Sequence, residues 1–347
     1  MTEDVLFSTN KNGVGTILLN RPKALNSISL DMLLPMLEKL KEWETDDTIN
    51  LIILKGAGSK GFCAGGDIKT LYEAKNNILA LQKAQRFFEL EYQLDQYIHR
   101  YSKPIIACLE GVVMGGGVGL TYGCSHRIVT NQTKWAMPEM NIGFFPDVGA
   151  AYFLNKAPGK IGRYLALTAT VIRSDDVLYV NGADTCIPSE KLHGFLHQIE
   201  EINWHQQNVT TALEKQIQAY SQPTGLKSEL ALWQEDIDRH FSFSTIEEII
   251  HSLEQTPNEF TVKTKEALLS KSPFSLKVTL QQQIKGEHAS LEECFSTDLI
   301  LAKNFMAHND FYEGVRSVLI DKDNSPRYQY KHLSDVTGEM VQQFFHL

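Results

Sequence analysis

The strongest constraint on the fold is an alternation of short apolar runs with longer segments of helical periodicity. The runs at 14–20, 51–55, 105–109 and 127–129 are bounded by Gly, Asn, Pro or charged residues and predict buried strands. Between the first two, 29–43 repeats apolar residues every three or four positions and predicts a helix that Ser29 can cap. Alternation of this kind predicts an α/β fold.

The pattern changes in the last two fifths of the chain. Beyond about residue 204, glycine becomes sparse and Leu, Ile and Phe recur at helical spacing. A length of 347 residues suits one large domain with a smaller addition. We therefore expect an α/β catalytic domain over 1–204, followed by a mostly helical C-terminal region over 205–347.

Composition excludes several classes of protein. The net charge of -9 argues against a nucleic-acid binder held by bulk charge. No uninterrupted apolar stretch approaches the ~18 residues that predict a membrane span. The acidic N-terminus is unlike a secretory signal. Five scattered cysteines without a CxxC pair predict free thiols in a reducing compartment, and we expect the cytoplasm. No HExxH motif is present, and no metal site is expected.

A G-x-G-x-x-G match at 56–61 invites a dinucleotide-binding interpretation. That fingerprint should lead directly into an apolar helix, whereas an irregular stretch follows here. A plain glycine loop is the better interpretation. No G-x-S-x-G nucleophile elbow and no phosphate-binding P-loop is present.

Two further glycine clusters suit the close approach of a ligand. Gly65 and Gly66 precede Asp67, which can cap a helix that begins near Ile68. The triplet 115–117 lies between a strand-like run and an apolar segment. Three glycines weaken a helix start, and the amides there are suited to an oxyanion. A tight turn and close strand–helix packing are the structural alternatives.

Glu139 and Asp147 flank a largely apolar stretch. Buried carboxylates are costly unless they are hydrogen-bonded or functional. Taken alone, a loop that points both acids to solvent is the more ordinary interpretation.

Together these segments resemble the crotonase (enoyl-CoA hydratase/isomerase) family. The resemblance is carried by Asn20–Ser27, Phe62–Ile68, Gly111–Gly117, Met137–Glu139 and Ala166–Thr168. It implies a ββα spiral domain that binds an acyl-CoA thioester.

Within the family, the chain resembles the branch that hydrolyses 3-hydroxyisobutyryl-CoA in valine catabolism. The marks of this branch are Phe87–Tyr92, Gly115–Gly119, Phe145–Gly149, Ser272–Lys277, Asp310–Arg316 and Leu319–Asp323. The resemblance therefore covers nearly the whole chain.

The resemblance also implies residue roles. The amides of Gly66 and Gly116 would form an oxyanion hole for the thioester oxygen. Glu139 would be the main catalytic carboxylate, with Asp147 as its catalytic partner. Glu91 and Asp147 would lie near the acyl hydroxyl, so that the substrate contacts Glu91, Gly116, Glu139 and Asp147.

One position separates hydrolase from hydratase. A hydratase of this family uses two glutamates, one at the position of Glu139 and one two residues after the glycine triplet. The second position is Gly119 here, whereas Asp147 replaces a glycine that is typical of hydratases. The pattern favours thioester hydrolysis.

Several alternatives stay open at this level. Glu139 can attack directly or act as a general base, and the acyl chain is undetermined. A lyase that uses Glu139 alone and a non-catalytic acyl-CoA-binding subunit are the competing functions. No cofactor beyond the CoA of the substrate is expected, and a homo-oligomer is possible. Basic candidates for the CoA phosphates are Arg21, Lys23, Lys60 and Lys69.

Overall fold

The computed structural model describes residues 3–223 and 227–346, which pack into two compact units. The first unit contains the chain up to Gly66 together with Gln93–Trp135 and Ile172–Lys227. The second contains Asp67–Tyr92, Ala136–Val171 and the chain from Ser228 onward. Each unit is assembled from separate segments of the chain. The expected division at residue 204 stays a prediction about domain organisation.

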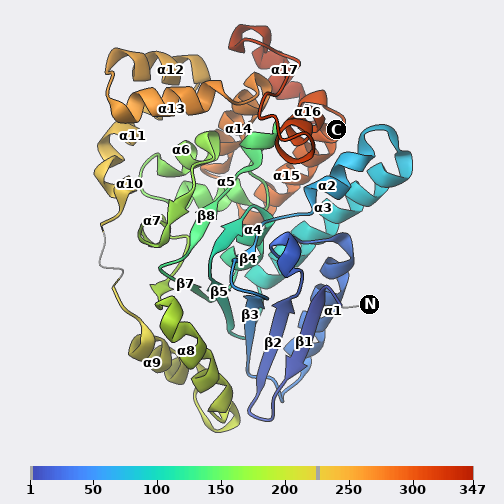
Figure 1. Ribbon diagram of the computed structural model, residues 1–347, viewed down its shortest axis with the longest axis vertical. Helices are drawn as coiled ribbons and strands as arrows, with labels where there is room; N and C mark the ends of the chain where they lie inside the picture. The colour runs from blue at the N-terminus through green and yellow to red at the C-terminus, as the bar shows by residue number, and fades with distance from the viewer. Residues whose placement is uncertain (1–2, 224–226, 347) are drawn as a thin grey trace. The chain divides into compact units, whose positions relative to one another are not determined.

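A six-stranded sheet forms the centre of the first unit (Figure 1). Its strands run in the order β1 (Val5–Thr9), β2 (Val14–Leu19), β3 (Leu51–Gly56), β5 (Ile105–Leu109), β7 (His126–Val129) and β10 (Thr185–Cys186). Only the β1–β2 pair is antiparallel. The four predicted strands are confirmed to within a residue or two, whereas the more polar edge strand β1 was missed.

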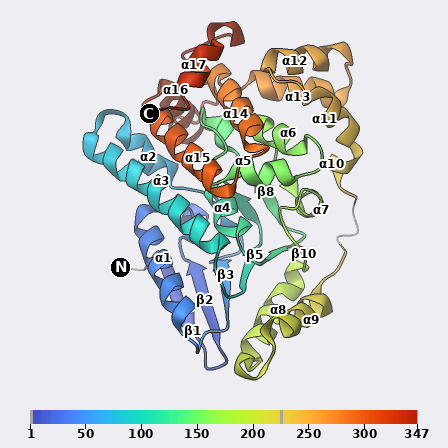
Figure 2. The ribbon, with the colours of Figure 1, turned by 180° about the vertical axis from the view of Figure 1, so that it is seen from behind.

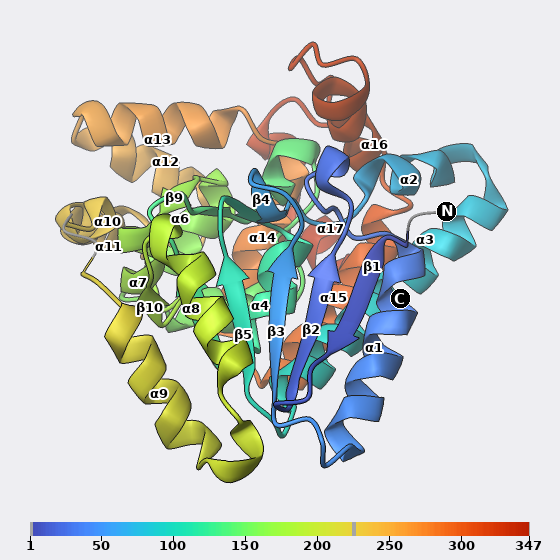
Figure 3. The same ribbon diagram turned by 60° about the horizontal axis from the view of Figure 1, so that its bottom comes forward.

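Both faces of this sheet are apolar, which explains why its strands read as continuous hydrophobic runs. Residues 51 and 53 of β3 pack with Phe195 and Trp204 in a core beside α8 (Ser189–Glu201) and α9 (Val209–Tyr220). Figure 3 shows β5, β3, β2 and β1 side by side.

The opposite face carries α1 (Leu30–Thr45), which Figure 2 shows alongside β1 and β2. Met36 and Leu40 of α1 and Leu54 of β3 line the same small cavity on this face. Helix α1 begins directly after Ser29, as predicted.

A smaller sheet of the first unit runs in the order β4 (Gly61–Cys63), β6 (Val112–Met114), β8 (Lys134–Ala136) and β9 (Ile172–Arg173). β4 and β6 are parallel neighbours. Two short helices follow strands of this sheet, namely α4 (Gly116–Tyr122) and α7 (Ser174–Tyr179). The long helix α3 (Ile78–His99) passes from the second unit into the first, because the boundary falls after Tyr92.

Helices build the second unit, and α12 and α13 pack side by side (Figure 1). Its α-helices besides α3 are α2 (Ile68–Tyr72), α5 (Ala150–Phe153), α6 (Ile161–Thr168), α10 (Glu229–Leu232), α11 (Gln234–His240), α12 (Ile246–Gln255), α13 (Glu259–Leu269), α14 (Pro273–Gly286), α15 (Leu291–Phe305), α16 (Asn309–Val315) and α17 (Gly338–Gln343). Among the described residues no strand follows Cys186, so the predicted helical character of 205–347 is confirmed.

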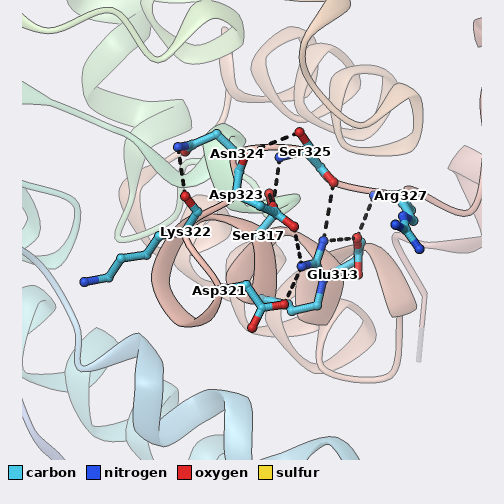
Figure 4. A network of polar contacts seen from close by, with 9 residues as sticks. Glu313, Ser317, Asp321, Lys322, Asp323, Asn324, Ser325 and Arg327 are labelled. Atoms are coloured by element: carbon cyan, nitrogen blue, oxygen red, sulfur yellow. Dashed lines mark hydrogen bonds and ion pairs between the residues drawn. The ribbon is translucent and has the colours of Figure 1, made fainter.

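A network of charged side chains joins α16 to the turn that follows it (Figure 4). Arg316 donates to Glu313, Asp321 and Asp323 over 2.6–3.0 Å. Glu313 also accepts from the backbone amide of Arg327 at 2.6 Å. Glu313, Arg316, Asp321 and Asp323 belong to the stretches 310–316 and 319–323, whose sequences mark the predicted branch, and here they organise the chain.

Candidate active site

The glycine amides predicted for an oxyanion hole lie after two neighbouring strands of the first unit. Since β4 and β6 are parallel and paired, the segments that follow them begin at the same edge of the sheet. A Cβ on Gly65 would lie 3.1 Å from the carbonyl oxygen of Met114 and 3.4 Å from the amide nitrogen of Gly116. Gly66 directly follows Gly65, so the structure brings the two predicted segments together.

The three glycines of the triplet serve different purposes. Gly115 has a φ of 53°, a left-handed conformation that glycine adopts without strain. A Cβ on Gly117 would lie 2.7 Å from the carbonyl oxygen of Cys63, so close packing excludes a side chain there. Gly116 is the first residue of α4, where an amide has no acceptor within its own helix. The packing interpretation therefore explains Gly117, and the oxyanion interpretation depends on Gly116.

The predicted carboxylates lie in the second unit, and all three are buried. Glu139 begins the 3-10 helix η3 (Glu139–Ile142) and is 8 % exposed, Asp147 is 5 % exposed, and Glu91 of α3 is 2 % exposed. The interpretation that Glu139 and Asp147 point to solvent is wrong. Burial of carboxylates at this level is rare unless they are paired or functional.

Their hydrogen-bond partners differ. The hydroxyl of Tyr92 donates to Oδ2 of Asp147 at 2.7 Å. Oε2 of Glu139 is buried and has no hydrogen-bond partner in the part of the chain that the structure describes. An unpaired buried carboxylate oxygen costs free energy that folding alone does not justify. Glu139 therefore has the features of a reacting group, and Asp147 those of an oriented one.

Aromatic rings cluster in the segment between Glu139 and Asp147 and around Tyr92, the hydrogen-bond partner of Asp147. Phe144 and Phe145 have ring centroids 4.6 Å apart, and Phe144 also stacks on Phe88 at 5.8 Å. Tyr92 contacts Phe295 of α15 with centroids 5.7 Å apart. Such surroundings hold few dipoles and disfavour charge.

The pKa values reflect this environment. Burial, and then the charge of Asp147, raise the pKa of Glu139 well above its ordinary value. Burial raises the pKa of Asp147 from 3.8 to about 6, although the hydrogen bond from Tyr92 acts in the opposite direction. Because the two carboxyl groups interact, they titrate as a pair. A buried pair with raised pKa values is typical of a catalytic site.

The segment that carries Asp147 has an uncommon backbone. Val148 has a φ of 52° and Gly149 a φ of 80°. A β-branched residue at positive φ is strained by about 1–3 kcal/mol. Strain of this kind persists where the surrounding structure holds it in place, which is common at functional sites.

The basic candidates for CoA phosphates separate into two groups. Lys23 and Lys60 line one recess of about 280 Å³ in the first unit, together with Asn26 and Ser59. Arg21 instead donates to the carbonyl of Ser27 at 2.7 Å and pairs with Asp4 at 3.4 Å. Lys69 is exposed on α2 and does not line this recess.

Two residues near the carboxylates were missed by sequence reasoning as members of the site. Tyr92 lies inside the segment 87–92, where its position next to Glu91 was the available signal. Asp298 is fully buried on α15, and nothing in the local sequence distinguishes it from a surface acid. At Asp67 the predicted helix start is confirmed, but its side chain makes no capping hydrogen bond.

Among the described residues, no three His, Cys, Asp or Glu side chains are arranged to hold a metal ion. No helix in the same part of the chain is long and apolar enough to cross a membrane.

The chain belongs to the enoyl-CoA hydratase/isomerase family, whose model matches residues 14–345. Both the predicted α/β crotonase fold and the predicted family membership are confirmed.

Curated relatives place the chain within the predicted branch. The mitochondrial 3-hydroxyisobutyryl-CoA hydrolase of Danio rerio is 40% identical over 99% of this chain and 89% of its own length. The protein of the same name from Homo sapiens is 39% identical over 99% of this chain and 88% of its own length.

Solved structures share the fold over the whole chain. A carnitinyl-CoA dehydratase from Mycobacterium thermoresistibile is 34% identical, with a TM-score of 0.92 over 100% of this chain and 97% of that one. An enoyl-CoA hydratase from Rhodobacter sphaeroides 2.4.1 is 31% identical, with a TM-score of 0.88 over 99% of this chain and 97% of that one.

Proposed function

We propose that this protein hydrolyses a short 3-hydroxyacyl-CoA thioester of the 3-hydroxyisobutyryl-CoA type to the free hydroxy acid and CoA. The observation that carries the proposal is the buried Glu139 with a free carboxylate oxygen, whose pKa responds to Asp147. Relatives named 3-hydroxyisobutyryl-CoA hydrolase, about 40% identical over nearly the full chain, support this substrate class.

In the proposed reaction, the amides of Gly66 and Gly116 bind the thioester oxygen as it becomes negatively charged. One such donor is worth roughly 3 kcal/mol of transition-state stabilisation. Glu139 either attacks the carbonyl carbon or takes a proton from an attacking water. The C–S bond breaks, and the CoA thiolate leaves and takes up the proton that the water loses. When Glu139 itself attacks, this water then hydrolyses the Glu139 anhydride to the free acid.

Asp147 gives the proposed specificity. In the proposed complex, an ionised Asp147 accepts a hydrogen bond from the 3-hydroxyl of the substrate. An ester that lacks this hydroxyl would leave a buried oxygen of Asp147 without a partner. Sites built on such a pairing discriminate strongly against the deoxy analogue. Glu91, buried next to Tyr92 on α3, is proposed to contact the same end of the substrate.

The CoA moiety is proposed to reach the recess lined by Lys23 and Lys60, because its phosphates require cationic groups on a protein of net charge -9. No cofactor beyond the CoA of the substrate is proposed. A role in valine catabolism, assembly into homo-oligomers and a cytoplasmic location remain predictions; the curated relatives are named as mitochondrial.

Release of free thiol from a panel of CoA esters tests the proposal directly. We expect 3-hydroxyisobutyryl-CoA and 3-hydroxypropionyl-CoA to be cleaved much faster than isobutyryl-CoA and propionyl-CoA. A protein that releases no thiol from any hydroxy ester would contradict the proposed function.

The route through Glu139 needs a separate experiment. A single turnover in heavy-oxygen water, followed by mass analysis of the peptide that contains Glu139 and of the acid product, tests for an anhydride that water opens at the Glu139 carbonyl; direct attack of water labels only the acid. Label in the peptide supports an anhydride of Glu139, because only a covalent route exchanges a carboxylate oxygen of the enzyme.

A lyase is the second candidate, because solved structures at 34% and 31% identity are named as a dehydratase and a hydratase. Gly119 argues against it, since it offers no side chain where a hydratase has its second glutamate. Loss of enoyl absorbance without thiol release would favour the lyase.

A further inference from the structure

Besides Glu91, Glu139 and Asp147, another buried carboxylate contacts the backbone next to Asp147. Asp298 of α15 is fully buried, and its two oxygens have separate donors. Oδ2 accepts from the backbone amide of Gly149 at 2.8 Å, and Oδ1 accepts from Nε2 of Gln282 at 2.7 Å. Asp298 therefore contacts the segment of Asp147 without being placed among the proposed reacting groups.

Gln282 of α14 completes a clamp on this segment. Its Nε2 also donates to the carbonyl oxygen of Pro146 at 2.9 Å. Together, Asp298 and Gln282 hold the carbonyl just before Asp147 and the amide two residues after it. The backbone on both sides of Asp147 is thereby fixed by side chains of two different helices.

Packing on α15 supports the same segment. A Cβ on Gly149 would lie 3.1 Å from the ring of Phe295, and Phe295 also contacts Tyr92, the donor to Asp147. Phe295 and Asp298 are three residues apart and so share one face of the helix. One face of α15 thus contacts both the backbone near Asp147 and its hydroxyl partner.

The chemistry of Asp298 argues that this contact has a function beyond filling space. A carboxylate is expensive to bury, and the charge of Asp147 adds to burial in raising the pKa of Asp298. A carboxylate nevertheless suits two facing N–H donors, because both of its oxygens accept. An Asn in its place would direct an N–H₂ group against one of these donors.

We propose that Asp298 and Gln282 are positioning residues that hold Asp147 in the orientation that selects thioesters with a 3-hydroxyl. This inference rests on the proposed function, in which Asp147 accepts from that hydroxyl. The strained φ of Val148 and the positive φ of Gly149 are the conformation that the clamp maintains.

The test compares kcat/KM for 3-hydroxyisobutyryl-CoA with that for isobutyryl-CoA. In Asp298→Asn and Gln282→Leu we expect the preference for the hydroxy ester to fall by about tenfold or more, with the deoxy ester little changed. In an Asp147→Asn background, Asp298→Asn should leave the preference unchanged, because both act through the same carboxylate.

Asp310→Asn is the matched control. Asp310 is also fully buried, and it also accepts two hydrogen bonds, from Ser272 at 2.6 Å and from the amide of Gln329 at 2.7 Å. Neither contact involves residues 146–149. We expect this variant to change hydrolysis of both esters by the same factor. Equal loss for both esters in Asp298→Asn and Gln282→Leu would overturn the inference and leave these residues a structural role.

Calorimetric binding in the Glu139→Gln background separates the inference from the proposed function. The clamp variants should weaken binding of the hydroxy ester and not of the deoxy ester, whether or not the wild type turns either over. If Asp298→Asn does not fold, Gln282→Leu carries the same comparison. Unchanged selectivity in the folded variant would overturn the proposal.

Discussion

The hydroxyl of Tyr92 lies 2.7 Å from Oδ2 of Asp147, and both residues are buried. Tyr92 remains a neutral donor, because burial and then the charge of Asp147 raise its pKa well above the ordinary value. The same hydrogen bond favours the ionised form of Asp147. Burial has the larger effect and raises the pKa of Asp147 to about 6. This pair therefore keeps Asp147 both oriented and able to ionise near neutral pH.

Removal of this donor should move the acid limb of activity. In Tyr92→Phe the pKa of Asp147 rises further, because a hydrogen bond that favoured the carboxylate is lost. The wild-type kcat/KM for the hydroxy ester should fall in acid as the Glu139–Asp147 pair takes up protons, and this limb should move up by about one pH unit in the variant. Steady-state kinetics over roughly pH 5 to pH 9, a range that brackets the titration, measures the wild-type fall in activity and its displacement in the variant.

Tyr312→Phe is the matched control for this prediction. The hydroxyl of Tyr312 is also buried in the second unit, but it donates to the carbonyl oxygen of Met306 at 2.7 Å. Its removal should cost stability without moving the pH profile. The same displacement in both variants would show that the effect is not specific to Asp147.

Replacement of Glu139 should separate binding from chemistry. Glu139→Gln keeps the volume of the side chain but removes its basicity and nucleophilicity. We expect kcat to fall by about a thousandfold or more, with the dissociation constant of a CoA ester changed by less than about tenfold. Thiol release and calorimetry measure the two quantities. Retained hydrolysis would exclude Glu139 from the central role.

The buried carboxylates should lower stability at neutral pH. The pKa of Asp147 rises from 3.8 to about 6 on folding, so its protonated form is favoured in the native state. The penalty is absent below pH 3.8, grows as pH rises and is complete above about 6. A rise of about two units corresponds to on the order of 3 kcal/mol.

Asp147→Asn removes this penalty and can still accept from Tyr92. At about pH 8, roughly two units above the titration of Asp147, we expect the free energy of unfolding of the variant to exceed that of the wild type. The difference should disappear in acid. Urea unfolding at several pH values measures the trend. A variant that is equally destabilised at every pH would show that lost contacts outweigh the titration.

The glycine triplet offers a test of close packing. Gly117→Ala places a Cβ 2.7 Å from the backbone oxygen of Cys63, which cannot rotate away. The start of α4 must shift, with a loss of about 1–3 kcal/mol in stability. Because Gly116 is the adjacent residue, we also expect kcat to fall. Thermal unfolding and thiol release measure the two effects.

Gly338→Ala is the control for that substitution. An added Cβ at Gly338 meets nothing within 4 Å, and the position begins α17. Since alanine favours helix, stability should be unchanged or slightly raised, and activity should be unaffected. A comparable loss in both variants would count against the packing argument.

Much of the fold followed from local pattern. The runs at 14–20 and 51–55 place apolar residues on both faces of the strand. A parallel sheet that is covered on both sides requires this pattern. The strand β1 was missed because this edge strand is only partly buried, with burial that declines from Val5 to Thr9, and so needs fewer apolar residues. The strands β9 and β10 have two residues each, too few to show any period.

The carboxylates show where local reasoning stops. Taken alone, Glu139 and Asp147 were more ordinary as solvent-exposed loop acids, and only the resemblance to a family opposed that interpretation. The backbone that flanks Asp147 is held by Gln282 and Asp298, which lie more than a hundred residues further along the chain. No window of sequence contains those contacts.

The sequence by itself determined the α/β class, the glycines after two strands and the absence of a side chain at Gly119, because strand periodicity and residue identity are local properties. Only the tertiary structure decided that Glu139 is buried with an unpaired oxygen, that Tyr92 orients Asp147, and that Asp298 holds its backbone. Desolvation and long-range hydrogen bonds set the chemistry of an acid, and both arise only when distant segments pack together.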